Sequence, residues 1–346
     1  MGAVMVVRPA LVALLLASIA CSETSANGLD THTGPETGGA DEGAPPGHAT
    51  NAPAAEEEDA KGPFPIVLLH GMGGFVETKG LVKVEMFTGV VDDLTKSGNQ
   101  AFQTLSPPFD TSEERAKMIA PQLEKILADT GAKKLNLVGH SQGGLDARVI
   151  ASAGGLGLGK KIASISTIAT PHLGSGVADF ALGITEKVPD GLIDKGSDFF
   201  LGIAEKRMSD LDNDPALRAQ VTELSSPHMR DVFNPKYKDA PGVRYYSWAG
   251  RTNRQDGAGV CDDGEQKNDP EDVRLASPNL IATAKLLENG EGKANDGLVT
   301  VENAKWGKFQ KCVATDHNGF VVQSPLGFDV VPFYREVVAR VRKDGL

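Results

Sequence analysis

Lys134-Leu135-Asn136-Leu137-Val138-Gly139-His140-Ser141-Gln142-Gly143-Gly144 joins a short apolar run to a turn in which a serine stands between glycines. The run Lys134–Val138 is typical of a strand buried on both faces, and the residues after the turn, through Ala151, favour a helix. A Gly-x-Ser-x-Gly pattern between a strand and a helix indicates a tight turn that exposes the serine hydroxyl. The helix N-terminus behind the turn favours developing negative charge. We therefore predict that Ser141 is a nucleophile, against the alternative that the pattern arose by chance in a glycine-rich chain.

Further apolar runs along the chain predict the rest of the sheet. The strand-like runs are Ile66–Leu69, Ile162–Ala169 and Arg244–Trp248. An amphipathic helix is expected from about Thr111 to Asp129, with Asp110 and Glu113 at capping-box spacing. Buried strands that alternate with such helices predict an α/β fold, with a mostly parallel central sheet and helices on both faces. At about 172–242 the pattern is helical without an obvious strand, which predicts a helical cap or lid insertion.

Composition narrows the class of protein. The chain has 346 residues, 40% hydrophobic and 23% charged, with a formal net charge of −11. This excludes a coiled coil, a collagen, a disulfide-dense mini-domain and a multi-span membrane protein. Clustered Lys and Arg interleaved with aromatics are absent from the sequence, so nucleic acid is not an expected partner. Nine acids and no Lys or Arg lie between Ser22 and Ala60, which leaves a formal charge of −3 on residues 61–346 and suits an uncharged substrate.

The first sixty residues resemble an export signal and a tether. Arg8 precedes the apolar run Ala10–Ala20, which is too short to span a bilayer, and we expect residues 1–20 to be a signal peptide. Cys21 resembles the lipidated cysteine of a bacterial lipobox, although Ser18 departs from that pattern, and simple cleavage cuts the same bond. Residues 21–61 are expected to form a disordered tether before a folded domain at 62–346. The protein is expected to be exported, as an outer-membrane lipoprotein or a secreted protein that meets a membrane or lipid surface.

Two cysteines follow the tether. If Cys21 is acylated, Cys261 and Cys312 remain as one possible disulfide in an oxidising compartment. Three unrelated thiols are the alternative.

Five segments carry a resemblance to a known family. They are Pro65–Gly71, Asn136–Gly144, Ala169–Ser175, Tyr246–Gly250 and Asn295–Val299. In these residues the chain resembles the secreted bacterial triacylglycerol lipases of the Pseudomonas/Burkholderia type, over about 64–323 and with the motifs in the same order. The resemblance implies an α/β-hydrolase fold that hydrolyses carboxylic esters, particularly of lipids, through a Ser/Asp/His triad.

Attack on an ester places negative charge on the former carbonyl oxygen, and preorganised N–H donors must meet it. Gln142, the residue after the nucleophile, supplies one backbone N–H, and the loop after the first strand supplies the other. In that loop His70-Gly71 is followed by Met72, and the resemblance also places Met72 in the oxyanion hole. A glycine turn that merely reverses the chain is the alternative.

The order Ser, acid, His in this fold restricts the base and the acid. Only His172, His228 and His317 follow Ser141, and His317 lies late in a polar turn, so we predict His317 as the base. Asp296 precedes it in an Asn-Asp-Gly turn and is the predicted acid, to which the resemblance adds weight. The less favoured acids are Asp316, adjacent to His317, and the pair Asp262 and Asp263 in an acidic loop.

The chain departs from the family at its structural calcium site. The resembling lipases have an Asp ligand two residues after the catalytic His, where this chain has Gly319. Gln323 matches a neutral ligand position, and Leu275 stands where a second carboxylate is expected, with Asp272 offset nearby. Because Ca²⁺ requires carboxylate charge, we predict no metal site and no cofactor, with Cys261–Cys312 tying the same loops.

The predicted insertion has an apolar portion, Val177–Met208, that fits either a mobile lid facing lipid or an ordinary helical cap. The sequence as a whole predicts a lipase or esterase acting on acylglycerols or similar esters. An acyltransferase, a polyester depolymerase or a peptidase would keep the same triad, and a non-catalytic lipid-binding protein would keep only the fold. The need for a dedicated foldase is left open.

Overall fold

The computed structural model divides the chain into two units, Met1–Ala60 and Lys61–Leu346. The structure describes residues 62–74, 86–184, 214–253, 258–261, 276–278, 280–288, 293–322 and 328–346. Several predictions concern residues outside these ranges: the signal peptide, the tether, Cys21, most of the lid at 185–213, Asp262, Asp263, Asp272, Leu275 and Gln323.

A six-stranded parallel sheet forms the centre of the second unit. Its strands are β1 (Ile66–Leu69), β2 (Ala101–Gln103), β3 (Leu135–His140), β4 (Ile162–Ile168), β5 (Arg244–Gly250) and β6 (Lys308–Val313), in the order β2-β1-β3-β4-β5-β6. Every neighbouring pair is parallel. The four predicted strands and the α/β fold class are therefore confirmed. Strands β2 and β6 were not predicted, because β2 has three residues and β6 is an edge strand without a continuous apolar run.

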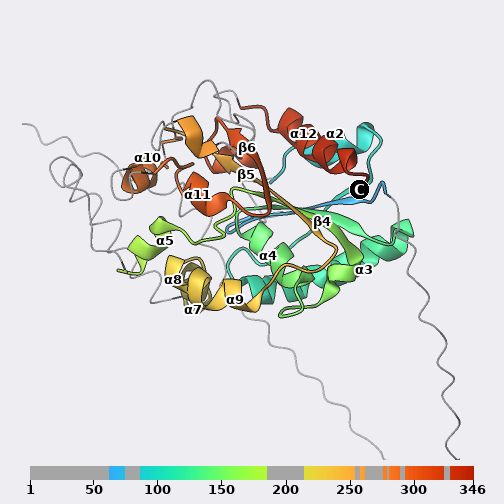
Figure 1. The fold of residues 1–346 in the computed structure, drawn as a ribbon, viewed down its shortest axis with the longest axis horizontal. Coiled ribbons are helices and arrows are strands. Elements are labelled where there is room, and N and C mark those ends of the chain that lie inside the picture. Colours follow the sequence, from blue (N-terminus) through green and yellow to red (C-terminus); the bar gives the residue numbers. More distant parts are fainter. Residues whose placement is uncertain are drawn as a thin grey trace, which may run out of the picture. The chain divides into compact units, whose positions relative to one another are not determined.

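Helices cover both faces of this sheet (Figure 1). The covering helices are α2 (Val90–Lys96), α3 (Ser112–Thr130), α4 (Gln142–Ala151) and α12 (Val330–Lys343). Alternate residues of β1 enter different cores, as the period of a strand requires: Ile66 and Leu68 pack with residues of α2 and α12, whereas Val67 and Leu69 pack with residues of α3 and α4. Burial on both faces explains why every residue of β1 is apolar.

The start of α3 differs from the prediction by one residue. Thr111 is the N-cap, and its hydroxyl accepts a hydrogen bond from the Glu114 amide at 3.4 Å. Asp110 instead accepts from the Thr111 amide at 2.8 Å. The predicted capping box at Asp110 and Glu113 is therefore wrong, because two adjacent residues can both cap and only geometry selects between them.

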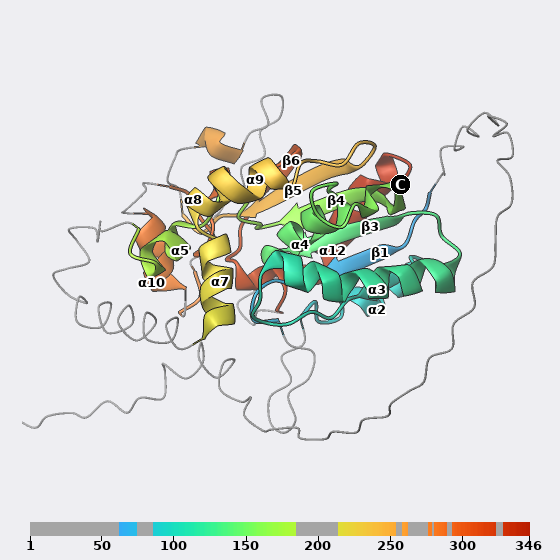
Figure 2. The ribbon, with the colours of Figure 1, turned by 90° about the horizontal axis from the view of Figure 1, so that it is seen from below.

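The remaining elements lie between and after the strands. They are α5 (Gly176–Ala181), α7 (Pro215–Glu223), α8 (Ser226–His228), α9 (Asn234–Lys236), α10 (Ile281–Leu286), α11 (Val301–Ala304), the 3-10 turns η1 (Leu158–Lys161), η3 (Ala258–Cys261) and η5 (Asn318–Phe320), and the π-turn η2 (Met229–Phe233). The described residues of the predicted cap, about 172–242, are thus helical wherever they are regular. Figure 2 shows α5, α7, α8 and α10 at one end of the sheet, the end toward which the strands run. In open α/β sheets that end carries the functional loops.

None of the helices in the described ranges is both long and apolar enough to cross a membrane.

Candidate active site

Ser141 occupies a strained turn between β3 and α4. Its backbone has φ 54° and ψ −129°, a conformation that residues other than glycine rarely adopt. The turn is held by the Ser141 amide, which donates to the Ile168 carbonyl of β4 at 2.8 Å, and the side chain is half-buried. A Cβ at Gly139 would clash with the Gly143–Gly144 backbone, and one at Gly143 would clash with the Leu69 carbonyl. The two predicted glycines are therefore required by close backbone approach.

The loop after β1 passes directly against Ser141. A Cβ built on Gly71 would lie 2.7 Å from the Ser141 Cβ and 3.2 Å from its Oγ, and the next residue is Met72. On the other side, Gln142 is the first residue of α4, so its N–H belongs to the amides that have no partner within the helix. The structure thus brings the two predicted oxyanion segments to the same serine.

Arg115 of α3 holds the loop after β1 in place. Its Nη2 donates to the His70 carbonyl at 2.6 Å, another N–H donates to the Pro107 carbonyl, and the guanidinium pairs with Asp146 of α4 at 2.9 Å. Arg115 and Asp146 side chains are both 0% exposed. Burial, and secondarily the Arg115 charge, lower the pKa of His70 to about 4, so His70 is neutral at pH 7 and serves the loop as a hydrogen-bonded ring.

Asp296 and His317 are joined twice. His317 Nδ1 donates to Asp296 Oδ2 at 2.9 Å, and the His317 amide donates to the Asp296 carbonyl at 2.9 Å. The other carboxylate oxygen of Asp296 accepts from the amides of Leu298 at 3.0 Å and Val299 at 2.8 Å. Both side chains are buried. With the proton on Nδ1 directed at a carboxylate, the imidazole keeps Nε2 as an acceptor.

His140 joins the His317 loop to the nucleophile turn. It immediately precedes Ser141, its Nε2 donates to the His317 carbonyl at 3.0 Å, and the two rings lie 4.7 Å apart between centroids. Burial, and secondarily the neighbouring His317, lower the pKa of His140 well below 6.5, so that a neutral ring lies beside His317. From the sequence, His140 could be assigned only to the turn, because nothing in the motif indicates which residue its ring will contact.

The competing residues have other partners. His172 is buried, contacts the Thr167 hydroxyl at 3.0 Å and stacks on Trp306 at 5.1 Å. His228 lies half-buried in α8. The Asp316 carboxylate accepts from the Ser277 amide at 2.7 Å, from the Ser277 hydroxyl and from the Gly319 amide at 2.9 Å, so it is engaged away from the His317 ring.

Gly319 stands where the resembling lipases have an aspartate ligand for calcium. A Cβ at this position would clash with the Thr315 hydroxyl oxygen, so an aspartate here would require Thr315 to move. Both oxygens of the nearby Asp316 already accept hydrogen bonds. In the part of the chain that the structure describes, no group of three or more His, Cys, Asp or Glu side chains is placed to hold a metal.

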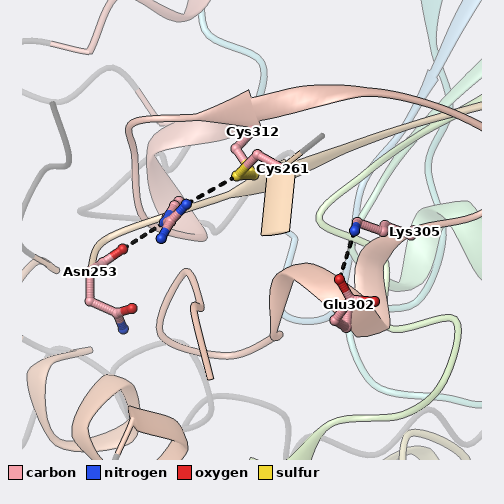
Figure 3. The surroundings of a disulfide bond; sticks show 6 residues. Asn253, Cys261, Glu302, Lys305 and Cys312 are labelled. Atoms are coloured by element: carbon pink, nitrogen blue, oxygen red, sulfur yellow. Dashed lines mark hydrogen bonds and ion pairs between the residues drawn. A yellow bond between two sulfur atoms is a disulfide. The ribbon is translucent and has the colours of Figure 1, made fainter. Parts of the chain in front are cut away.

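A disulfide joins η3 to β6, five residues before His317. Cys261 and Cys312 lie 51 residues apart in sequence and 5.5 Å apart between Cα atoms. Figure 3 shows the Cys261–Cys312 bond and, at the end of α11, Lys305, which pairs with Glu302 at 2.6 Å. The predicted pairing is therefore present, and it anchors the strand that leads into the His317 loop.

Comparisons with known proteins find lipases among the similar chains. No protein-family model matches the chain. It is 29% identical to the triacylglycerol lipase of Vibrio cholerae over 313 residues, covering 82% of this chain and 89% of that protein. It is 28% identical to the triacylglycerol lipase of Burkholderia plantarii, covering 73% of this chain and 76% of that protein.

Solved structures share the fold at lower identity. A mature lipase of Bacillus licheniformis is similar with a TM-score of 0.51 and 20% identity, covering 83% of this chain and 96% of that one. A metagenomic carboxyl esterase is similar with a TM-score of 0.56 and 17% identity, covering 81% and 76%. The chain is therefore an enzyme of the α/β-hydrolase fold, related to the bacterial triacylglycerol lipases.

Proposed function

We propose that the chain is a carboxylic ester hydrolase that cleaves acylglycerols or related lipid esters through Ser141, His317 and Asp296. The observation that carries this proposal is the buried 2.9 Å hydrogen bond between Asp296 and His317, in a loop that His140 joins to the strained turn of Ser141. An acid, an oriented imidazole and a strained serine are the three groups that activate a hydroxyl for acyl transfer, and the proposal requires His317 Nε2 to reach the Ser141 hydroxyl.

In the proposed mechanism His317 Nε2 takes the Ser141 hydroxyl proton as Oγ attacks the ester carbonyl carbon. The backbone N–H groups of Met72 and Gln142 donate to the resulting oxyanion. His317 then protonates the departing alcohol, which leaves an acyl group on Ser141. Water, activated by the same imidazole, attacks this acyl-enzyme and releases the acid. Throughout, Asp296 holds the imidazole tautomer and stabilises the imidazolium.

An apolar substrate is supported by the surface near the proposed oxyanion loop and by the relatives. Met72 and Leu173, which follow the ends of β1 and β4, are 40% and 47% exposed. Large exposed apolar side chains at a functional edge suit an acyl chain. The curated relatives are named triacylglycerol lipases. We also propose export, with Cys21 as the site of lipid attachment or of the new N-terminus.

A substrate panel tests the proposal. Wild type is expected to hydrolyse a short-chain p-nitrophenyl ester and emulsified triolein, and a fluorophosphonate probe is expected to label it. Faster cleavage of a polyhydroxyalkanoate film than of either ester would favour a polyester depolymerase. A chain that binds lipid but hydrolyses none of these and takes no label would contradict an enzymatic function.

We propose that the protein needs no calcium, because Gly319 supplies no carboxylate and both oxygens of Asp316 already accept hydrogen bonds. Incubation with EDTA is expected to leave the rate of ester hydrolysis within about twofold and the Tm within about 2 °C, since no bound ion stabilises the native state. Activity assays and thermal denaturation with EDTA, and with calcium in excess, measure this. A loss of several degrees that calcium restores would show that a site exists.

A further inference from the structure

The side chain of Gln142, the proposed oxyanion donor, is held at both ends of its amide. It is 0% exposed. Its Oε1 accepts from Gln220 Nε2 at 2.5 Å, and its Nε2 donates to the Asp110 carbonyl at 2.9 Å. A buried primary amide that finds partners for both oxygen and nitrogen has one permitted orientation.

Helix α7 carries Gln220 and a second partner of Gln142, Glu223. Glu223, at the last turn of α7, accepts from the Ser112 amide at the start of α3 at 2.9 Å and from Gln142 Nε2 at 3.4 Å. Gln220 also donates to the Pro108 carbonyl at 3.4 Å. Helix α7 is therefore tied both to Gln142 and to the segment that leads into α3.

The same segment continues to the other side of the proposed oxyanion hole. Arg115 lies one turn into α3 and donates to the His70 carbonyl at 2.6 Å, just before Gly71 and Met72. Burial, together with the negative charge of Asp146, raises the pKa of Glu223 to about 7. Replacing buried charged groups by apolar residues of similar volume is often neutral for stability, so packing alone does not account for this cluster.

We propose that Gln220 is a positioning residue for ester hydrolysis: by holding the Gln142 side chain it keeps the backbone N–H of Gln142 directed toward the oxyanion. Glu223 holds the same side chain through its Nε2. The inference rests on the proposed function. The main-chain amide of Gln142 follows a residue at φ 54° and ψ −129°, so the peptide needs external support to keep its direction. A shift of about 0.5 Å at such a donor is enough to lose most of its effect on the transition state.

The test is a double-mutant cycle on Gln142→Leu and Gln220→Leu, which replace the buried amides by apolar groups of similar shape. Rates on a soluble p-nitrophenyl ester are expressed per active site titrated with a fluorophosphonate. Gln220→Leu is expected to lower kcat about 10- to 30-fold and change KM less than about twofold, since a misdirected donor weakens only transition-state binding. The double variant is expected to lose no more than the worse single variant.

Three further variants separate positioning from mere packing. Glu223→Gln has a neutral side chain that keeps an acceptor oxygen, and we expect it to retain most of the wild-type kcat. Glu223→Leu has no acceptor, and we expect its kcat to be lower than that of the wild type. Gln122→Leu is the control, because the Gln122 side-chain amide holds a loop through hydrogen bonds with Leu105 but does not touch Gln142.

The outcomes distinguish this inference from the proposed function. Wild-type kcat per titrated site in Gln220→Leu, whatever its Tm, would overturn the positioning role and leave ester hydrolysis intact. Equal losses in Gln122→Leu and Gln220→Leu, or fully additive losses in the cycle, would also overturn it. A wild type that neither hydrolyses the ester nor takes the probe would instead refute the proposed function.

Discussion

Replacing Ser141 with alanine is expected to lower kcat/KM for a soluble carboxylic ester by about 10⁴- to 10⁶-fold. The remaining activity would come from the oxyanion hole and substrate binding alone. The hydroxyl is the only atom removed, and in the proposed mechanism it forms the bond to the substrate. The turn itself is held by the Ser141 amide and by the neighbouring glycines, so the fold is expected to survive. Steady-state kinetics, far-UV circular dichroism and fluorophosphonate labelling of both proteins measure the effect.

Ser166→Ala is the matched control for this prediction. Ser166 is a buried serine on β4, and among the described residues its Oγ has no hydrogen-bond partner, so removing it should change neither rate nor stability by much. A Ser141→Ala protein that keeps even a tenth of wild-type activity would show that another nucleophile acts. Equal losses in both variants would point to damage of the sheet.

Local pattern predicted the parts of the fold in which sequence neighbours decide the structure. The strand that becomes β1 is apolar throughout because helices cover both of its faces, and such a run is visible without any partner. In contrast, β6 has the burial of an edge strand, and its pairing with β5 depends on residues about sixty positions away. Pairing of that kind leaves little local trace.

The candidate site divides in the same way. The glycines around Ser141 could be predicted because their need arises within one turn. The preference for Asp296 over Asp316 could not follow from spacing alone, since it depends on Asp316 being held by Ser277. The Gln220–Gln142 contact joins residues 78 positions apart, and each glutamine taken alone resembles an ordinary surface residue.

Asp296→Asn is expected to lower kcat/KM by about 10³- to 10⁴-fold. The asparagine oxygen would keep the amides of Leu298 and Val299, which places its NH₂ group opposite His317 Nδ1. Two donors cannot face each other, so the imidazole proton would move to Nε2, the atom that must accept the Ser141 proton. Kinetics on a soluble ester, with the Tm measured in parallel, test this prediction.

Asp316→Asn provides the decisive comparison, because it makes the same replacement of one carboxylate oxygen by NH₂ in the residue next to His317. Its partners are the Ser277 and Gly319 amides and the Ser277 hydroxyl, and an amide oxygen still accepts from some of them, so we expect a loss of less than about tenfold, with a lower Tm. If the larger loss fell on Asp316→Asn, the acid of the triad would be Asp316, and the buried pair of Asp296 and His317 would only position the loop. If neither change lowered the rate, His317 would act without a carboxylate, and the tautomer argument would fail with it.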